Sequence, residues 1–173
     1  MDNLYKKYNR TIFKYIFYLV QNEPLAEDFM QETFLKAFKS RHSFRKESND
    51  ETYLRKIARN IVYDYFRRKK LIALLPYSRH HEQSQPDTVM NYIIQNEDRK
   101  ELFEALSKLK ITYREVLILR KIEQFSLEET AEILGWKIEK VKNTQRAALK
   151  ALKQVWKGVD VVGTEQIDMG RIK

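Results

Sequence analysis

The side chains best suited to binding a ligand lie in the last third of this 173-residue sequence, along one helical stretch. Its outward positions combine basic, hydroxyl and amide groups: Lys140, Lys142, Asn143, Thr144, Arg146 and Lys150. Lysine and arginine neutralise phosphates and amides bond base edges, so the combination is typical of a helix that binds DNA. The alternative is a helical hairpin whose lysines only keep it soluble, and the motif alone leaves that alternative open.

The pattern around these side chains predicts a helix-turn-helix over residues 126–153. Ser126 and Glu129 form an S-x-x-E capping box, which starts a helix, and Gly135 supplies the positive φ that ends it. A second helix begins near Ile138 and buries one face: Ile138, Val141, Ala148, Leu152 and Val155. A buried first helix followed by a basic second helix fits insertion into a DNA major groove.

A second basic face occurs in a helix expected from residue 49 or 50 to about Lys70. Asn49 or Asp50 can cap this helix. The expected inner face is Leu54, Ile57, Ala58, Ile61 and Tyr65, and the expected outer face is Arg55, Lys56, Arg59, Asn60, Tyr63, Arg67 and Arg68. Basic residues interleaved with tyrosine suit a nucleic-acid strand, with charges for phosphates and rings for bases. The helix dipole alone would favour basic residues near a C-terminus, but four in a row over 67–70 exceed that need.

Two further helices are predicted before this one. The first has the apolar face Tyr5, Tyr8, Ile12, Tyr15, Ile16 and Leu19, and Asn22-Glu23-Pro24 breaks it and caps the next. The second, about 25–41, is expected to bury Met30, Phe34, Ala37 and Phe38. Another of its faces carries Asp28, Gln31, Glu32 and Leu35. That acidic face is either simply solvated or a contact surface for a basic partner.

The remaining segments complete an all-α prediction of two small helical domains. Leu102, Phe103, Leu106 and Leu109 mark one helix, and Thr112 with Glu115 is expected to cap another that contains Val116–Leu119. With the helix-turn-helix they give a four-helix module. The predicted organisation is a domain over 1–70, a flexible linker over 71–95, a second domain over 96–157 and a disordered tail over 158–173.

Composition supports helices and an anionic partner. Four glycines and three prolines leave little turn chemistry for sheets, and the net charge of +9 suits nucleic acid. Residues 1–70 hold 16 Lys or Arg against 9 acidic residues, and residues 96–157 hold 14 against 10. There is no cysteine, and His80-His81 has no ligand cluster around it, so we expect neither a metal nor a cofactor. No apolar run suits a membrane span or a signal peptide, and we expect a cytoplasmic protein.

The order of these features resembles that of an extracytoplasmic-function (ECF) sigma factor, a bacterial RNA polymerase subunit. Residues 26–38, AEDFMQETFLKAF, resemble the family signature A-E-D-x-x-Q-E-x-F-x-K-A-F. Residues 43–70 resemble its promoter-melting segment, and residues 113–145 resemble its reader of the minus-thirty-five element. In the recognition helix the family often reads V-K-S-R-L-H-R, whereas residues 141–147 read V-K-N-T-Q-R-A. Tyr53 stands where the family usually has tryptophan.

The resemblance implies site residues by position. The core-polymerase surface would be Asp28, Gln31, Glu32 and Leu35. The minus-ten DNA surface would be Phe44, Arg55, Arg59, Asn60, Tyr63 and Arg67, with Phe44 and Asn60 near the pocket for a flipped base. The minus-thirty-five surface would be Arg120, Lys140, Lys142, Asn143, Thr144 and Arg146.

The implied function is promoter recognition and opening as part of RNA polymerase, without catalytic residues in this chain. The implied partners are core RNA polymerase, promoter DNA and an anti-sigma factor, which the family commonly has, and no membrane insertion is expected. Two other readings remain open: a helix-turn-helix regulator that acts without core polymerase, and a helical interaction protein with no nucleic-acid partner. The acidic face argues against the first, and the net charge argues against the second.

Overall fold

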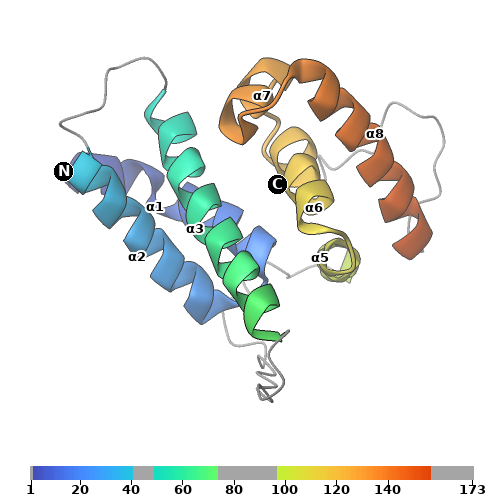
Figure 1. Cartoon of the computed structure of the whole chain (residues 1–173), viewed down its shortest axis with the longest axis horizontal. Helices are drawn as coiled ribbons and strands as arrows, with labels where there is room; N and C mark the ends of the chain where they lie inside the picture. The colour runs from blue at the N-terminus through green and yellow to red at the C-terminus, as the bar shows by residue number, and fades with distance from the viewer. Residues whose placement is uncertain (1, 41–48, 74–96, 157–173) are drawn as a thin grey trace. The chain divides into compact units, whose positions relative to one another are not determined.

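The computed structural model describes residues 2–40, 49–73 and 97–156, and all the elements within these ranges are helices. The chain divides into two compact units, Met1–Asp87 and Thr88–Lys173. Figure 1 shows α1, α2 and α3 in the first unit and α5 to α8 in the second. The predicted all-α fold of two helical units is confirmed. The predicted tail and all but the start of the predicted linker lie outside the described residues.

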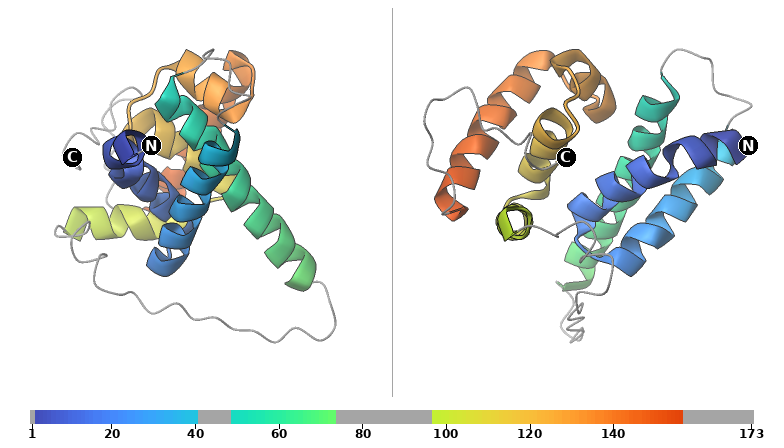
Figure 2. Two further views of the ribbon diagram at one scale, coloured as in Figure 1. Left: turned by 90° about the vertical axis from the view of Figure 1, so that its left-hand side faces the viewer. Right: turned by 180° about the vertical axis from the view of Figure 1, so that it is seen from behind.

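The first unit is a bundle of α1 (Asp2–Val20), α2 (Glu23–Ser40) and α3 (Asp50–Ala73), in which each helix packs against the other two (Figures 1 and 2). The predicted break between the first two helices is confirmed. Gln21 takes a positive φ of 54°, and the Asn22 Oδ1 accepts a 2.9 Å hydrogen bond from the Leu25 amide. Asn22 therefore caps α2, whose first turn accommodates Pro24.

The buried face of α2 differs from the prediction. The buried residues are Ala26, Phe29, Thr33 and Ala37, whereas Phe38 is 56% exposed and Met30 and Phe34 are half-buried. The apolar pattern misled because α2 carries large apolar residues around most of its circumference. Thr33 can be buried because its hydroxyl donates a 2.6 Å hydrogen bond to the Phe29 carbonyl.

The third helix begins as predicted, with the Asn49 Oδ1 accepting from the Glu51 amide at 3.2 Å, but it continues to Ala73. Leu54, Ala58 and Ile61 are buried as expected. The expectation that Arg55 lies on the outer face is wrong, because its side chain is 1% exposed in the core. It pairs with Glu51 at 2.7 Å and its guanidinium lies 5.6 Å from the centre of the Tyr15 ring. An arginine is tolerated there because its charge is partnered.

The second unit contains α5 (Glu97–Ser107), α6 (Ile111–Leu117), α7 (Leu127–Leu134) and α8 (Ile138–Val155). A π-helical turn, η2 (Ile118–Ile122), continues α6, so the described part of this unit has the four helices predicted. Helix α8 packs against α5, α6 and α7. In Figure 1, α5 is seen nearly end-on while α8 runs lengthwise. The Trp156 Nε1 donates to a Glu101 carboxylate oxygen at 3.4 Å and connects the end of α8 to α5.

The predicted capping box at Thr112 and Glu115 is wrong. The N-cap of α6 is Lys110, whose side chain makes no capping bond, and Glu115 is fully buried. Arg114 fixes this turn instead. It donates to the Leu106 carbonyl at 2.9 Å and to the Ser107 carbonyl at 2.8 Å, two carbonyls at the end of α5. Burial lowers the pKa of Arg114 to about 10, still well above neutrality, so the guanidinium remains charged.

Candidate nucleic-acid interface

The first helix of the predicted helix-turn-helix, α7, begins with a reciprocal capping box. The Glu129 amide donates to the Ser126 hydroxyl at 3.1 Å, and the Ser126 amide donates to the Glu129 carboxylate at 2.7 Å. Hydrogen bonding of the Glu129 carboxyl to the Ser126 backbone, and secondly to the Ser126 side chain, lowers the pKa of Glu129. Gly135 ends the helix with a φ of 66°, and the Trp136 amide bonds to the Ala131 carbonyl at 2.9 Å. The predicted start, turn and end of α7 are confirmed.

The second helix, α8, presents its charged side chains outward. Val141, Ala148 and Leu152 are buried, and Ile138 and Val155 are half-buried, as the predicted inner face requires. The proposed DNA-facing residues are exposed except Thr144, which is half-buried: Lys140, Lys142, Asn143, Thr144, Arg146 and Lys150. Such an arrangement offers several cations and one exposed amide to a nucleic acid.

The turn that leads into α8 contains a cation–π contact that the sequence pattern did not reveal. The Lys140 ammonium lies 4.1 Å from the centre of the Trp136 ring. Lys137 is the N-cap of α8, and its side chain makes no capping bond. The contact with the Trp136 ring restrains Lys140, which is the first lysine of the expected DNA-facing set. The spacing of Trp136 and Lys140, i and i+4, is the signal that could have indicated it.

Arg120 lies on η2 and is engaged within its own unit. Its Nε donates to the Gln145 Oε1 at 3.0 Å, and its Nη1 donates to the Phe125 carbonyl. Arg120 is one of the residues that the family resemblance implies at the minus-thirty-five DNA, whereas Gln145 is not among them. A π-helical turn has no clear sequence signal, so the direction of this side chain could not be anticipated.

The outer face of α3 brings together four of the six residues expected at the minus-ten DNA. Asn60 is exposed, the Arg59 guanidinium lies 4.3 Å from the centre of the Tyr63 ring, and Arg67 pairs with Asp64 at 2.9 Å on the surface. Arg55 is removed from this set by its burial. Phe44 lies outside the described residues.

The acidic face of α2 is on the surface of the first unit. Asp28 and Gln31 are exposed and Leu35 is 61% exposed, while the half-buried Glu32 pairs with Lys36 at 2.8 Å. Phe38, predicted to be buried, adds a second large apolar side chain one turn after Leu35. The face therefore combines a carboxylate, an amide and exposed apolar groups, which is typical of a protein-binding surface rather than a solvated one.

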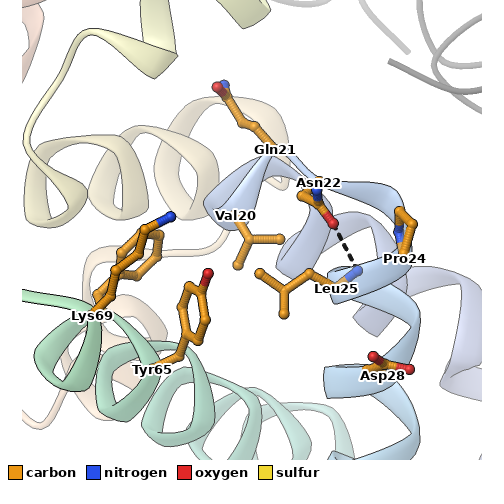
Figure 3. A pocket seen from close by; sticks show the side chains of 9 residues that line it. Val20, Gln21, Asn22, Pro24, Leu25, Asp28, Tyr65 and Lys69 are labelled. Atoms are coloured by element: carbon orange, nitrogen blue, oxygen red, sulfur yellow. Dashed lines mark hydrogen bonds between the residues drawn. The ribbon is translucent and has the colours of Figure 1, made fainter. Parts of the chain in front are cut away.

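A cavity of about 270 Å³ opens beside this face. Figure 3 shows Val20 and Leu25 facing each other across it, with Tyr65 and Lys69 contributed by α3. Asp28 also lines it.

Over the part of the chain that the structure describes, no cluster of three or more His, Asp or Glu side chains could hold a metal ion. None of the described helices is long and apolar enough to cross a membrane.

Comparison with known proteins gives matches over both units. The model of Sigma-70 region 2 matches residues 4–72, and that of Sigma-70 region 4 matches residues 99–152. The ECF RNA polymerase sigma factor SigX of Bacillus subtilis is 31% identical over 156 residues, which cover 87% of this chain and 80% of SigX. The RNA polymerase sigma factor YlaC of the same species is 34% identical, and the match covers 89% of this chain and 90% of YlaC.

A solved structure agrees in fold. The sigma factor RpoE from Bartonella quintana, in complex with the anti-sigma factor NepR, superposes with a TM-score of 0.70 at 24% identity, over 92% of this chain and 98% of that chain. The sequence matches cover both helical units, and the two Sigma-70 regions follow each other in the same order as the units. The chain belongs to the ECF family of RNA polymerase sigma factors, which bind core RNA polymerase and direct promoter-specific initiation.

Proposed function

We propose that the two units divide the work of this sigma factor. The N-terminal helices bind core RNA polymerase and open the minus-ten DNA, and the C-terminal unit binds the minus-thirty-five duplex. The observation that carries the proposal is that two different family models match two separate units, each with exposed basic residues on one long helix. A core-independent helix-turn-helix regulator would have no need of the first unit, and that reading is not favoured.

The core-binding surface is proposed to be Asp28, Gln31, Glu32 and Leu35 on α2. Support comes from an acidic and apolar face on a chain whose net charge is +9. A basic partner surface would neutralise the carboxylates, and Leu35 would supply apolar area at the centre of the contact.

The minus-ten surface is proposed to be Arg59, Asn60, Tyr63 and Arg67 on α3, together with Phe44. Asn60 can hydrogen-bond an extruded base through its amide, and the aromatic side chains can stack on bases. Binding of this kind would offset the few kcal/mol that unstacking a base requires.

The minus-thirty-five surface is proposed to centre on Lys142 and Asn143, with Lys140, Thr144 and Arg146 beside them. A recognition helix contacts base edges mainly through its N-terminal residues. Lys140, Lys142, Asn143 and Thr144 lie in the first two turns of α8, and Arg146 lies in the third.

Further partners and location follow from the family. Sigma factors are transcription regulators, and we propose that this chain performs no chemistry itself, because polymerase supplies the catalysis. An anti-sigma factor is proposed as a partner, since RpoE from Bartonella quintana was solved with NepR. The cytoplasm is the proposed location, because that is where RNA polymerase acts.

Reconstituted transcription tests the function. Core polymerase with this chain should initiate from a subset of a promoter library, and core alone should not. A pull-down should recover the chain with core polymerase. A chain that bound promoter duplexes tightly without core, and that failed to associate with core, would support the regulator instead.

A further inference from the structure

The Arg120 side chain connects three parts of the helix-turn-helix unit by hydrogen bonds. Arg120, on η2, donates from Nε to the Gln145 Oε1 of α8 at 3.0 Å. Its Nη1 donates to the carbonyl of Phe125, the residue directly before the Ser126 N-cap of α7. One guanidinium therefore holds both the start of α7 and the middle of α8.

Gln145 lies on the inner side of α8. It follows the fully buried Val141 by four residues and precedes the fully buried Ala148 by three, so the three share a stripe. An amide near a buried stripe needs a hydrogen-bond partner, and Arg120 provides it. The family's frequent V-K-S-R-L-H-R has leucine at this position, which could not accept a bond from an arginine. The pair is therefore a feature of this chain's own sequence.

The surroundings of Arg120 favour an internal role. Two of the guanidinium's five N–H groups are used by the amide and carbonyl, and the Arg120 charge contributes to lowering the pKa of the Glu129 carboxyl. Two acceptors of the same unit thus engage a side chain that the family resemblance assigns to DNA. Lys142, Arg146 and Lys150, by contrast, are exposed on α8.

We propose that Arg120 is a positioning residue of the recognition helix and does not neutralise a DNA phosphate, because Gln145 holds its guanidinium inside the unit. Arg120 fixes where α8 lies relative to the start of α7, and exposed cations of α8 such as Lys150 supply the phosphate contacts. This inference rests on the proposed minus-thirty-five function of the C-terminal unit.

The salt dependence of DNA binding separates the two roles. Each phosphate contact contributes about 0.9 to the slope of log Kobs against log salt concentration. Holoenzyme would be reconstituted from core polymerase and the full chain, and its binding to a promoter fragment titrated at several salt concentrations. We expect Arg120→Gln, which removes the charge but keeps a donor, to leave the slope unchanged. The matched control Lys150→Gln should reduce it by about 0.9. A similar reduction in Arg120→Gln would overturn the proposal.

A second variant tests whether Gln145 is what keeps the Arg120 guanidinium away from DNA phosphates. Gln145→Leu should release the guanidinium and steepen the slope by about 0.9, and adding Arg120→Gln to that variant should reverse the change. An unaltered slope in Gln145→Leu would show that Gln145 does not withhold Arg120. Both tryptophans of the chain, Trp136 and Trp156, lie in this unit, so their fluorescence during denaturation checks that each variant is folded.

Failure of the proposed function would give a different result. Base changes in the minus-thirty-five element would then leave binding by the native holoenzyme unaffected, and Lys150→Gln would have the native slope. That outcome would refute both proposals. Normal dependence on the minus-thirty-five sequence, with a reduced slope in Arg120→Gln, would refute only the role given to Arg120.

Discussion

At the scale of single residues, α3 shows how one side-chain type serves two purposes. Arg55 is 1% exposed and stabilises the core through Glu51 and Tyr15. Arg67 is exposed and pairs with Asp64 on the surface, where an ion pair contributes about 1 kcal/mol or less. A phosphate can therefore replace Asp64 at little expense, whereas Arg55 cannot leave its site without exposing a cavity. Only Arg67 of the two is suited to DNA.

Asn60 carries the clearest prediction for promoter opening. Asn60→Ala should abolish or strongly reduce open-complex formation, because the exposed amide that would hydrogen-bond an extruded base is lost. Fold stability should change little at this exposed position. Permanganate reactivity of the promoter bubble measures the effect. Duplex binding through the minus-thirty-five element should persist, and a normal bubble in the variant would refute the assigned role.

Asn143 and Lys150 are expected to differ in what they contact. Asn143→Ala should change the preferred base at one minus-thirty-five position and weaken binding to the native site by about 1–3 kcal/mol. Lys150→Ala should weaken all sequences alike and reduce the salt slope by about 0.9, because Lys150 lies on the fourth turn of α8, beyond reach of base edges.

Titrations of holoenzyme on single-base promoter variants, at several salt concentrations, test this division. The two substitutions are controls for each other. Altered base preference in Lys150→Ala with an unchanged salt slope would reverse the assignment.

At the scale of helices, local chemistry could be predicted and packing could not. Ser126, Glu129 and Gly135 act within a few residues of one another, so sequence alone located both ends of α7. Thr112 and Glu115 have the same spacing, but the bonds from Arg114 to the end of α5 decide where α6 starts. A four-residue capping motif cannot indicate a hydrogen bond between residues eight apart, such as Arg114 and Leu106.

The prediction of the buried face of α2 was wrong, and the contacts of Arg120 within its own unit were not predicted, for a related reason. Helix α2 carries large apolar residues around most of its circumference, so its apolar pattern fits more than one rotation of the helix. Packing against α1 and α3 selects the rotation that buries Phe29 and exposes Phe38. Arg120 lies on a π-helical turn, where the 3.6-residue period no longer applies. The exposed α8 residues were placed correctly because an amphipathic helix with a regular period fixes its own outer face.

Gly135 gives a prediction for the turn of the helix-turn-helix. Gly135→Ala should destabilise the C-terminal unit by about 1–2 kcal/mol, because a Cβ disfavours its φ of 66°. Apart from the two neighbouring residues, no heavy atom lies within 4 Å of the added Cβ, so backbone strain is the only expected cause. Denaturation followed by Trp136 and Trp156 fluorescence measures it. Gly135→Asn should be less destabilising, since asparagine tolerates this conformation, and equal losses in both variants would contradict that explanation.

At the scale of the whole molecule, charge is distributed so that two partners of opposite sign can be bound. The net charge of +9 favours DNA, and α3 and α8 expose basic side chains. Helix α2 instead exposes Asp28 beside Gln31 and Leu35. A single chain can thus contact polymerase through one helix and promoter DNA through others. The same-sign charges on the DNA-binding faces discourage them from binding a basic polymerase surface.

Charge reversal on α2 tests this separation of partners. Asp28→Lys combined with Glu32→Lys should weaken association with core polymerase at least tenfold, since two attractive contacts become repulsive. The fold should survive, because Asp28 is exposed and the Glu32–Lys36 pair contributes only about 0.5 kcal/mol. Glu104→Lys with Glu132→Lys makes the same change in net charge at exposed sites of the second unit, and should leave core affinity near native. Competition binding to core measures both variants. Equal weakening in the two would attribute the effect to net charge, and unchanged affinity in the α2 variant would remove α2 from the polymerase contact.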